Sequence, residues 1–566
     1  MFVGLSVFFS ILIPPAIRNA LNFIIDKTKE LEGQPSIGEF GDFFGPDILK
    51  FAGLVIGFSA LSGFFMYCMR KTMIVMSRLI EYDLRRDIYA HYQELDSGFF
   101  RRNKIGDMMA RVSSDVTKVR MYLGPALMYG VRVAFLFSMI IYSMFQVSTT
   151  LSLYALLPLP FLSVSIYYVS RIINKRSSLI QKQVGKLNST AQEVYSGIRI
   201  IKSYVKENEF QEFFDAESVD YKQKALRLAR VQALFFPLMI LLVSLSTLLT
   251  LYVGGKLIVA GEITAGNIAE FVIYINMLTW PITSIGWIAS LIQEAEASQE
   301  RINEMLNTES AIKNRATNTT PIEGSIEFKD VSFTYPDTGI EALKNVSFKI
   351  NKGEKLVIVG RTASGKTTIS DLLMRFFDVT SGQILIDGKD IKDHDLTNLR
   401  QRIGCVPQNV FLFSDTISQN IKFGQPTAER PDIEFYSEMA AIKSDIEAFP
   451  DGYETNVGER GVTLSGGQKQ RISIARALIK RPDMVILDDC LSAVDANTEH
   501  KILSYLDESL AGKTAIIITH RISNLLNFDK VLVMDEGQLV DYGTHDHLVK
   551  KDGYYRQLVE HQYHED

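Results

Sequence analysis

The sequence predicts two regions of different fold class: an α-helical membrane domain with six long transmembrane helices, followed by an α/β domain. Six mostly apolar stretches of about 20 residues or more lie in the first half of the chain. After them, short β-type runs alternate with helix-type runs, which predicts an α/β domain with a largely parallel core. The β-type runs are residues 355–359, 383–386, 484–487, 515–518 and 531–534. With 566 residues, 47% hydrophobic residues and a mean hydropathy of +0.08, the chain is too long for one domain and unusually apolar. We expect the membrane domain in residues 1–305, a polar linker in 306–323 and the α/β domain in 324–566.

The apolar stretches are each long enough to cross the hydrocarbon core of a bilayer, which is about 30 Å thick. They are residues 2–25, 48–69, 122–147, 149–172, 233–259 and 268–291. Buried helices of a large soluble protein are the alternative, but residues 233–252 contain no charged residue, which favours a membrane. The first stretch has no basic segment before it and carries Pro14 and Pro15, so we do not interpret it as a cleaved signal peptide. Met1 leaves no room for a leading interfacial helix, and whether it is the natural start is left open.

Loop charges predict the orientation. Lys and Arg gather between the second and third stretches and between the fourth and fifth, so we expect both segments on the cytoplasmic side, as helical extensions of the spans. The preference of Lys and Arg for cytoplasmic loops explains the basic runs without a nucleic-acid ligand. The net charge of −5 gives no argument for nucleic-acid binding either, so we expect no nucleic-acid partner. Cys68, Cys405 and Cys490 lie far apart without metal-ligand spacing and are expected to be free thiols.

Arg132 lies inside the third apolar stretch. Ionisable residues inside a span are costly and are candidates for function. We hypothesise that Arg132 faces a water-filled cavity and favours anionic or amphiphilic cargo. The alternative is an arginine that extends its side chain to the membrane interface.

A glycine-rich loop follows the β-type run at residues 355–359 and precedes a helix-type run. Its backbone N–H groups can surround phosphates, Lys366 supplies a positive charge, and the Thr367 hydroxyl can ligate Mg²⁺. We count Thr368 with this candidate ATP site. The loop consists of Gly360, Arg361, Thr362, Ala363, Ser364, Gly365, Lys366 and Thr367.

A second motif, Leu464-Ser465-Gly466-Gly467-Gln468, precedes a helix-type run at residues 469–480. Its backbone N–H groups and the positive end of the helix can face an anion. The next β-type run ends in Asp488 and Asp489, which could serve a metal ion and a water molecule. The five-residue motif alone would arise by chance in about one in a thousand chains of this length.

In this order the motifs resemble those of ATP-binding cassette (ABC) exporter half-transporters, over nearly the whole chain. The runs at residues 413–416, 457–461 and 488–495 are most similar to bacterial multidrug-type half-transporters that work as heterodimers. The resemblance implies an ATPase-coupled transporter in the cell membrane, bacterial inner or plasma membrane, with a cytoplasmic α/β P-loop nucleotide-binding domain. It also implies ATP and Mg²⁺ as cofactors, export of amphiphilic small molecules or lipids, contact with membrane lipids, and a second half-transporter as partner.

The resemblance assigns roles to single residues. Tyr335 matches the aromatic residue that stacks on adenine, and Gln408 matches a glutamine that touches the metal and links the site to the membrane domain. Asp488 matches the aspartate that organises Mg²⁺, so Thr367, Gln408 and Asp488 form the expected metal set. Asp495 matches an acid that communicates across the dimer. His520 matches the histidine that contacts the γ-phosphate; for it and for Tyr335, a purely structural role is the alternative.

In this family two nucleotide-binding domains stack head to tail. Each ATP then lies between the glycine-rich loop of one chain and the Leu464–Gln468 motif of the other, so one chain cannot complete a site. ATP binding and hydrolysis are expected to switch the membrane helices between inward- and outward-facing states. Residues 105–112 and 195–204 resemble the loop segments that dock on these domains.

Asp489 departs from the family pattern, in which glutamate positions or deprotonates the attacking water. Aspartate is one methylene shorter, roughly 1.5 Å, and a misplacement of about 1 Å can cost about 10²-fold in rate. We therefore predict a slow site in this chain. The alternative is a tolerated substitution in which the water bridges the gap.

Three hypotheses follow. The favoured one is a subunit of a heterodimeric exporter, because Leu464–Gln468 is intact and can complete the site of a partner that carries glutamate. A homodimeric lipid or drug exporter with reduced turnover is the second. An ATP-gated channel or regulatory membrane protein is the third. ATPase activity of the chain alone and with a partner separates the three.

Overall fold

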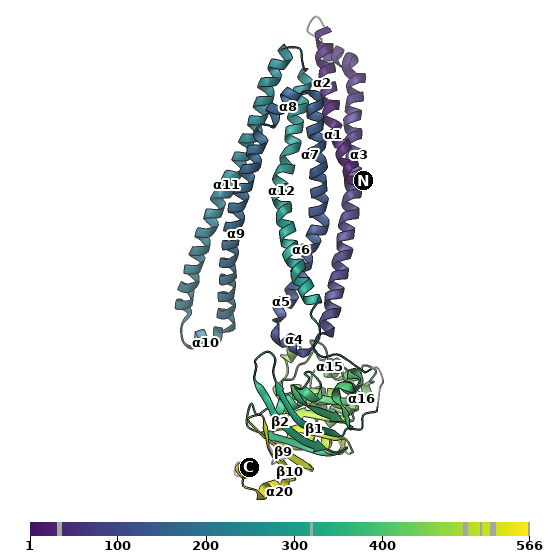
Figure 1. Cartoon of the computed structure of the whole chain (residues 1–566), viewed down its shortest axis with the longest axis vertical. Coiled ribbons are helices and arrows are strands. Elements are labelled where there is room, and N and C mark those ends of the chain that lie inside the picture. The colour runs from purple at the N-terminus through teal and green to yellow at the C-terminus, as the bar shows by residue number, and fades with distance from the viewer. Residues whose placement is uncertain (31–36, 317–320, 491–495, 510–511, 521–527, 564–566) are drawn as a thin grey trace. The chain divides into compact units, whose positions relative to one another are not determined.

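The computed structural model describes residues 1–566 except 31–36, 317–320, 491–495, 510–511, 521–527 and 564–566 (Figure 1). The chain forms two compact units. The first contains Met1–Ala90 and Met109–Asn307, and the second contains His91–Met108 and Thr308–Asp566. The predicted boundaries at residues 305 and 324 stay predictions, and residues 317–320 of the predicted linker lie outside the described residues.

Long helices build the first unit. Six of them are long and apolar enough to cross a membrane, which confirms the six predicted spans. At 1.5 Å per residue, the 53 residues of α11 extend about 80 Å. This length greatly exceeds a bilayer core and accommodates the predicted cytosolic extensions. The segments, some of which continue into the second unit, are α1 (Phe2–Ile11), α2 (Ile13–Glu30), α3 (Ile37–Glu94), α5 (Ile105–Ala110), η1 (Arg111–Asp115), α6 (Val116–Met121), η2 (Tyr122–Ala126), α7 (Leu127–Val147), α8 (Thr149–Leu156), α9 (Pro158–Ser196), α10 (Ile198–Ser203), α11 (Glu207–Val259) and α12 (Ala265–Leu306).

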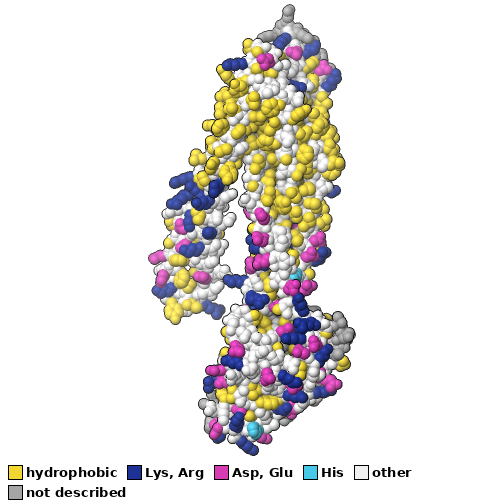
Figure 2. All heavy atoms as spheres, in the orientation of Figure 1, with side chains coloured by type: hydrophobic (Ala, Val, Ile, Leu, Met, Phe, Trp, Pro, Cys, Tyr) yellow, Lys and Arg dark blue, Asp and Glu magenta, His cyan; other side chains and the backbone are white. Residues whose placement is uncertain are grey.

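These helices pack in groups. Helices α9 and α11 lie side by side, and α12 packs against α2, α6, α7 and α11 (Figure 1). The core of the unit includes Ile140, Met144, Phe271 and Tyr274, all fully buried. Figure 2 shows apolar side chains over the upper lengths of the helices and many Lys and Arg side chains on the lower lengths of α9 and α11. This pattern agrees with spans that continue as charged helices.

Two sheets build the second unit. The six-stranded sheet has the order β10-β9-β3-β8-β7-β6, with parallel pairing from β9 to β6 and an antiparallel edge strand β10. The four-stranded sheet has the order β2-β1-β4-β5 and is antiparallel. The strands are β1 (Ile326–Thr334), β2 (Glu341–Ile350), β3 (Lys355–Gly360), β4 (Ser381–Ile386), β5 (Lys389–Asp390), β6 (Ile403–Val406), β7 (Met484–Asp488), β8 (Thr514–Ile518), β9 (Lys530–Asp535) and β10 (Gln538–Gly543).

The central strands are buried on both faces, as expected for parallel strands covered on both sides. Side chains alternate along a strand, so Val357 and Val359 of β3 join one hydrophobic core while Leu356 and Ile358 join another. The predicted run at residues 383–386 forms β4, which belongs to the antiparallel sheet rather than to the parallel core. A short apolar run predicts a strand but not its partner.

The second unit also contains helices and helical turns. They are α4 (Ser97–Arg102), α13 (Lys366–Leu373), η3 (Ile391–Asp393), α14 (Leu396–Arg402), α15 (Ile417–Lys422), α16 (Arg430–Met439), α17 (Lys443–Glu447), η4 (Gly452–Glu454), η5 (Glu459–Gly461), α18 (Gly466–Leu478), α19 (Ala496–Ser509), α20 (His545–Lys550) and α21 (Tyr554–Tyr563).

Candidate functional site

Four neighbouring parallel strands end at one edge of the large sheet. The loop after β3 carries Lys366, Gln408 follows β6, Asp488 and Asp489 end β7, and His520 follows β8. Because the carboxyl ends of parallel strands meet at the same edge, these side chains gather around one cavity of about 510 Å³. Residues 362–368 and Tyr335 line the same cavity. The structure thus brings together side chains that are up to 185 residues apart in the sequence.

The glycine-rich loop has the backbone that its sequence predicts. Gly360 and Gly365 have φ of 155° and 95°, and a Cβ on Gly365 would lie 2.4 Å from the Ala342 carbonyl oxygen. Only glycine fits there. The Lys366 Nζ donates hydrogen bonds to the carbonyl oxygens of Gly360 (2.9 Å) and Arg361 (2.6 Å). The lysine is therefore folded back over its own loop, beside the space that phosphates would take.

Buried charges face each other in this cavity. Burial lowers the pKa of Lys366, and the charges of Asp488 and Asp489 oppose that shift. Burial raises the pKa of Asp488, as does the nearby Asp489, whereas a hydrogen bond from Thr367 and the charge of Lys366 lower it. Two acids within a buried site repel each other until a cation joins them. The arrangement is suited to a bound cation and a bound anion together.

Asp489 sits on a constrained turn. Its φ is 47°, a left-handed conformation that aspartate adopts more readily than most residues. Its backbone N–H donates to the Ile518 carbonyl oxygen at 2.8 Å, which ties the end of β7 to β8. The Gln408 Nε2 lies 3.5 Å from the Asp489 Oδ2. His520 lines the same cavity, and burial and the charge of Lys366 lower its pKa.

Tyr335 follows β1, so the smaller sheet supplies it. Its hydroxyl lies 3.1 Å from the Thr368 Oγ1 and donates to the Asp371 Oδ2 at 3.4 Å. Burial raises the pKa of Tyr335, and it raises the pKa of Asp371 to about 6. The tyrosine ring is thereby fixed beside the helix that begins at the glycine-rich loop.

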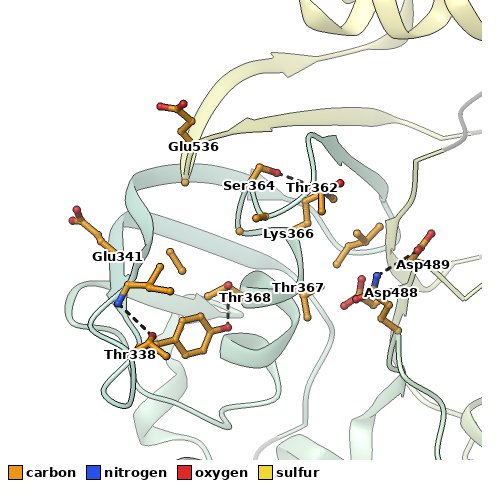
Figure 3. Close-up of a pocket in the computed structure, with 18 of the residues that line it drawn as sticks. Thr338, Glu341, Thr362, Ser364, Lys366, Thr367, Thr368, Asp488, Asp489 and Glu536 are labelled. Atoms are coloured by element: carbon orange, nitrogen blue, oxygen red, sulfur yellow. Dashed lines mark hydrogen bonds between the residues drawn. The ribbon is translucent and has the colours of Figure 1, made fainter. Parts of the chain in front are cut away.

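The cavity also contains residues that the sequence reasoning missed. In Figure 3, Glu341, Glu536 and Thr338 lie on the opposite side of the cavity from Asp488 and Asp489. Arg101 lines the cavity as well, although it comes from α4, more than 200 residues earlier in the chain. The turn sequence Asp535-Glu536-Gly537 was a detectable signal for a loop at this edge, whereas nothing local in the sequence indicates Arg101.

The Leu464–Gln468 motif does not line this cavity. Ser465 caps helix α18: its Oγ accepts from the Gln468 N–H at 3.3 Å, and the Gln468 Oε1 accepts from the Ser465 N–H at 3.0 Å. Leu464 is buried, and Ser465 and Gly466 are exposed. The motif therefore presents a helix N-terminus on the surface, as the sequence predicts.

The oxygen-rich donor set fits Mg²⁺. Thr367 and Asp488 are hydrogen-bonded to each other and Gln408 lies in the same cavity. Mg²⁺ prefers oxygen ligands and takes only one or two protein carboxylates together with substrate phosphates. Among the described residues, no cluster of three or more His, Cys, Asp or Glu side chains could hold a metal ion by itself.

Two predicted residues lie elsewhere. Asp495 lies outside the described residues. Arg132 lies in α7 of the helical unit, half-buried, with its Nη1 3.4 Å from the Met66 sulfur. Its Nε is buried and has no hydrogen-bond partner within the described parts of the chain.

Comparisons with known proteins agree with the fold and with the cavity. Residues 1–282 match the family "ABC transporter transmembrane region", and residues 343–492 match the family "ABC transporter". A solved structure, that of a bacterial Atm1-family ABC exporter with ATP bound, superimposes with a TM-score of 0.80. It shares 26% sequence identity with this chain and covers 99% of this chain and 97% of its own.

Curated relatives extend over most of the sequence. The uncharacterised ABC transporter ATP-binding protein YknU of Bacillus subtilis is 37% identical over 85% of this chain and 83% of its own length. The multidrug resistance-like ATP-binding protein MdlA of Escherichia coli is 36% identical over 88% and 84%. The ATP-dependent lipid A-core flippase of Photobacterium profundum is 34% identical over 84% and 82%.

ABC half-transporters work as dimers, with either an identical or a different partner. The six spans and the bacterial relatives make this chain an integral membrane protein with a cytoplasmic nucleotide-binding domain. The chain therefore belongs to the ABC transporter family and is an ATPase-coupled exporter half-transporter.

Proposed function

We propose that this chain is one half of a heterodimeric exporter of amphiphilic small molecules or lipids, and that its own ATP site turns over slowly. The observation that carries the proposal is Asp489, which takes the place of a catalytic glutamate beside the buried Asp488. The names of relatives such as the multidrug resistance-like protein MdlA and the lipid A-core flippase support an amphiphilic cargo.

Each residue of the cavity has a proposed task. The backbone of residues 360–368 and the Lys366 ammonium hold the phosphates of ATP, and Tyr335 stacks on the base. Thr367, Asp488 and Gln408 would hold Mg²⁺, which would supply positive charge beside the phosphates. His520 donates a hydrogen bond to the terminal phosphate, a role that suits a neutral imidazole because its pKa is lowered.

The slow turnover follows from the reach of Asp489. The carboxylate orients the attacking water, and its backbone is held by the hydrogen bond to Ile518 (2.8 Å). The side chain therefore cannot move forward to replace the missing methylene without breaking that bond. An error of about 1 Å in the position of a catalytic group can cost about 10²-fold in rate.

The Leu464–Gln468 motif remains competent in this account. Its serine and backbone N–H groups lie at the surface of α18, available to a nucleotide bound by the partner. The chain therefore donates an intact half-site while its own site is weak. We infer that the partner carries glutamate and that most hydrolysis takes place at the partner's phosphate loop.

A group of side chains in the helical unit supports the proposed cargo class. The Arg70 Nη2 donates to the Tyr129 hydroxyl at 3.3 Å, and the Tyr129 ring lies 5.5 Å from Trp280 and 5.8 Å from Trp287. Arg132 lies three residues from Tyr129, and its buried Nε has no hydrogen-bond partner among the described residues. Two guanidinium groups beside aromatic rings suit a molecule with an anionic head and an apolar body.

The decisive experiment uses the purified full-length chain. Vanadate-sensitive ATPase activity is measured for the chain alone and after mixing with a candidate partner half-transporter that carries glutamate at the position of Asp489. High activity only in the mixture supports the heterodimer. Full activity of the chain alone supports the homodimeric exporter instead, and absence of activity in both, with a cargo-independent conductance, supports a channel.

The cargo class has its own test. Arg132→Ala is compared with Arg132→Lys in proteoliposomes loaded with an anionic or a cationic fluorescent amphiphile. We expect the alanine variant to lose transport of the anionic compound at least about fivefold more than that of the cationic one, and the lysine variant to retain most of it. Equal losses for both compounds would refute the role of Arg132.

A further inference from the structure

Helix α4 (Ser97–Arg102) is attached firmly to the α/β unit. Asp96 caps the helix by accepting from the Phe99 N–H at 3.0 Å, and its second oxygen accepts from the Ala311 N–H at 2.7 Å. Phe99 is buried. A Cβ on Gly98 would lie 3.4 Å from the Phe377 ring, so the helix backbone packs directly against that ring. The position of the next side chains of α4 is thereby fixed.

Arg101 of this helix lies over the ring of Tyr335. Its guanidinium carbon is 4.4 Å from the Tyr335 ring centroid and 5.7 Å from that of Phe377. Its Nε is 3.4 Å from the Asp337 Oδ2, two residues after the tyrosine. A planar guanidinium on an aromatic ring within 6 Å is a cation–π contact. The ring of Tyr335 therefore already has a stacked, planar partner.

The other contacts of Tyr335 leave little freedom. Phe333 and Phe377 approach the ring in edge-on geometry at 4.8 and 5.5 Å, and the hydroxyl is held by Thr368 and Asp371. Arg101 and Tyr335 line the same cavity as the glycine-rich loop. A nucleotide whose phosphates bind the glycine-rich loop would bring its base to the Tyr335 ring, where the base meets the Arg101 guanidinium.

We propose that Arg101 occupies the position of the nucleobase on Tyr335 and that ATP must displace it, so that α4 opposes binding of the base but not of the phosphates. The proposal rests on the role of Tyr335 as the base-stacking residue. A guanidinium and a purine are both planar and cannot occupy one ring face together at stacking distance. The displaced arginine keeps Asp337 as an acidic neighbour, so its charge stays paired after it leaves the ring.

The test separates the base from the phosphates by two probes. Binding of ATP and of inorganic tripolyphosphate, which has no base, is measured with EDTA on the full-length protein, and the ratio of the two affinities is compared. Arg101→Ala and Arg101→Gln remove the stacked cation. Arg102→Ala is the matched control, because it removes the same charge from the same helix.

We expect Arg101→Ala and Arg101→Gln to raise the ratio of ATP to tripolyphosphate affinity by about 2- to 30-fold, the range of a cation–π contact. Arg102→Ala should leave the ratio unchanged. In a Tyr335→Leu background the same Arg101 substitutions should have no effect on the ratio, which a double-mutant cycle measures directly.

Two results would overturn the proposal. A fall in the ratio for Arg101→Ala would mean that the guanidinium holds the base rather than competing with it. An unchanged ratio, with both affinities reduced alike, would mean that Arg101 acts only through its charge. If Tyr335→Leu alone leaves the ratio unchanged, the base-stacking role of Tyr335 fails, and that outcome is distinct from a failure of the Arg101 proposal.

Discussion

Asp489→Glu should accelerate ATP hydrolysis by restoring the missing reach. The Asp489 backbone is fixed by its bond to the Ile518 carbonyl oxygen at 2.8 Å, so the added methylene advances the carboxylate by roughly 1.5 Å towards the water. A misplacement of about 1 Å can cost about 10²-fold in rate, which corresponds to about 2.7 kcal/mol of activation free energy. The turnover at this site should therefore rise by about one to two orders of magnitude.

The substitution also has a cost that can be estimated. Glutamate tolerates the left-handed backbone of position 489 (φ 47°) less well than aspartate, which costs about 1 kcal/mol of folding stability. The gain in rate should therefore come with a slightly lower melting temperature. A loss of activity caused by misfolding would show as a much larger decrease.

The assay is steady-state, vanadate-sensitive ATPase activity, together with counting of bound nucleotide per dimer. Asp489→Asn is the matched control: it has nearly the same shape, loses the charge, and should remove the residual activity of this site. If Asp489→Glu leaves the rate unchanged while nucleotide occupies both sites, the reasoning from side-chain reach is wrong.

Three further predictions follow from the α/β unit. Asp488→Asn should retain ATP binding in EDTA but lose about tenfold or more of the tightening that Mg²⁺ produces, because the buried carboxylate beside Thr367 is neutralised. An undiminished Mg²⁺ effect in a binding titration would exclude Asp488 as a ligand. Phe328→Ala should lower the free energy of unfolding by about 3–5 kcal/mol, because the ring is 1% exposed and stacks on Phe348 at a centroid distance of 4.4 Å. A loss below about 1 kcal/mol in chemical denaturation would contradict this packing. Burial raises the pKa of Asp371 from 3.8 to about 6, so the folded state binds this proton more tightly than the unfolded state. The stability that the protonated carboxyl contributes is fully present below pH 4 and is lost as the pH rises through 6. The loss in free energy of unfolding is on the order of 1–3 kcal/mol. Asp371→Asn should flatten that part of the stability profile in thermal scans between pH 4.5 and 6.5, and an identical profile would refute the assignment.

The meeting of these side chains in one cavity was predictable because they lie at or after the carboxyl ends of strands. Asp488 ends β7, Gln408 and His520 follow β6 and β8, and Lys366 begins the helix after β3, and parallel strands bring such residues to one edge. Their roles towards a nucleotide stay predictions. The six spans were predictable for a similar reason, since their length and apolar content suffice to identify them.

Other features depend on contacts that no local pattern encodes. The apolar run at residues 383–386 predicts a strand, but it does not predict that this strand pairs with β1 in an antiparallel sheet. That pairing depends on which strand edge is available in the folded unit. Arg101 looked like one of many basic residues after the second span, and the positive-inside rule explained it fully. Its place over Tyr335 appears only when α4 packs against Phe377. The Asp495 prediction and the dimer roles stay predictions.

The reciprocal cap at the start of α18 has a consequence for assembly. Ser465 and Gln468 satisfy each other's backbone groups, and Gln468 also reaches Asp445 at 3.4 Å. The motif is therefore already structured in the single chain, with Ser465 and Gly466 exposed at the start of α18. The Ser465 hydroxyl accepts from the Gln468 N–H and keeps its own proton to donate. Under the proposed function, it can therefore bind a phosphate of the partner's nucleotide without losing the helix cap.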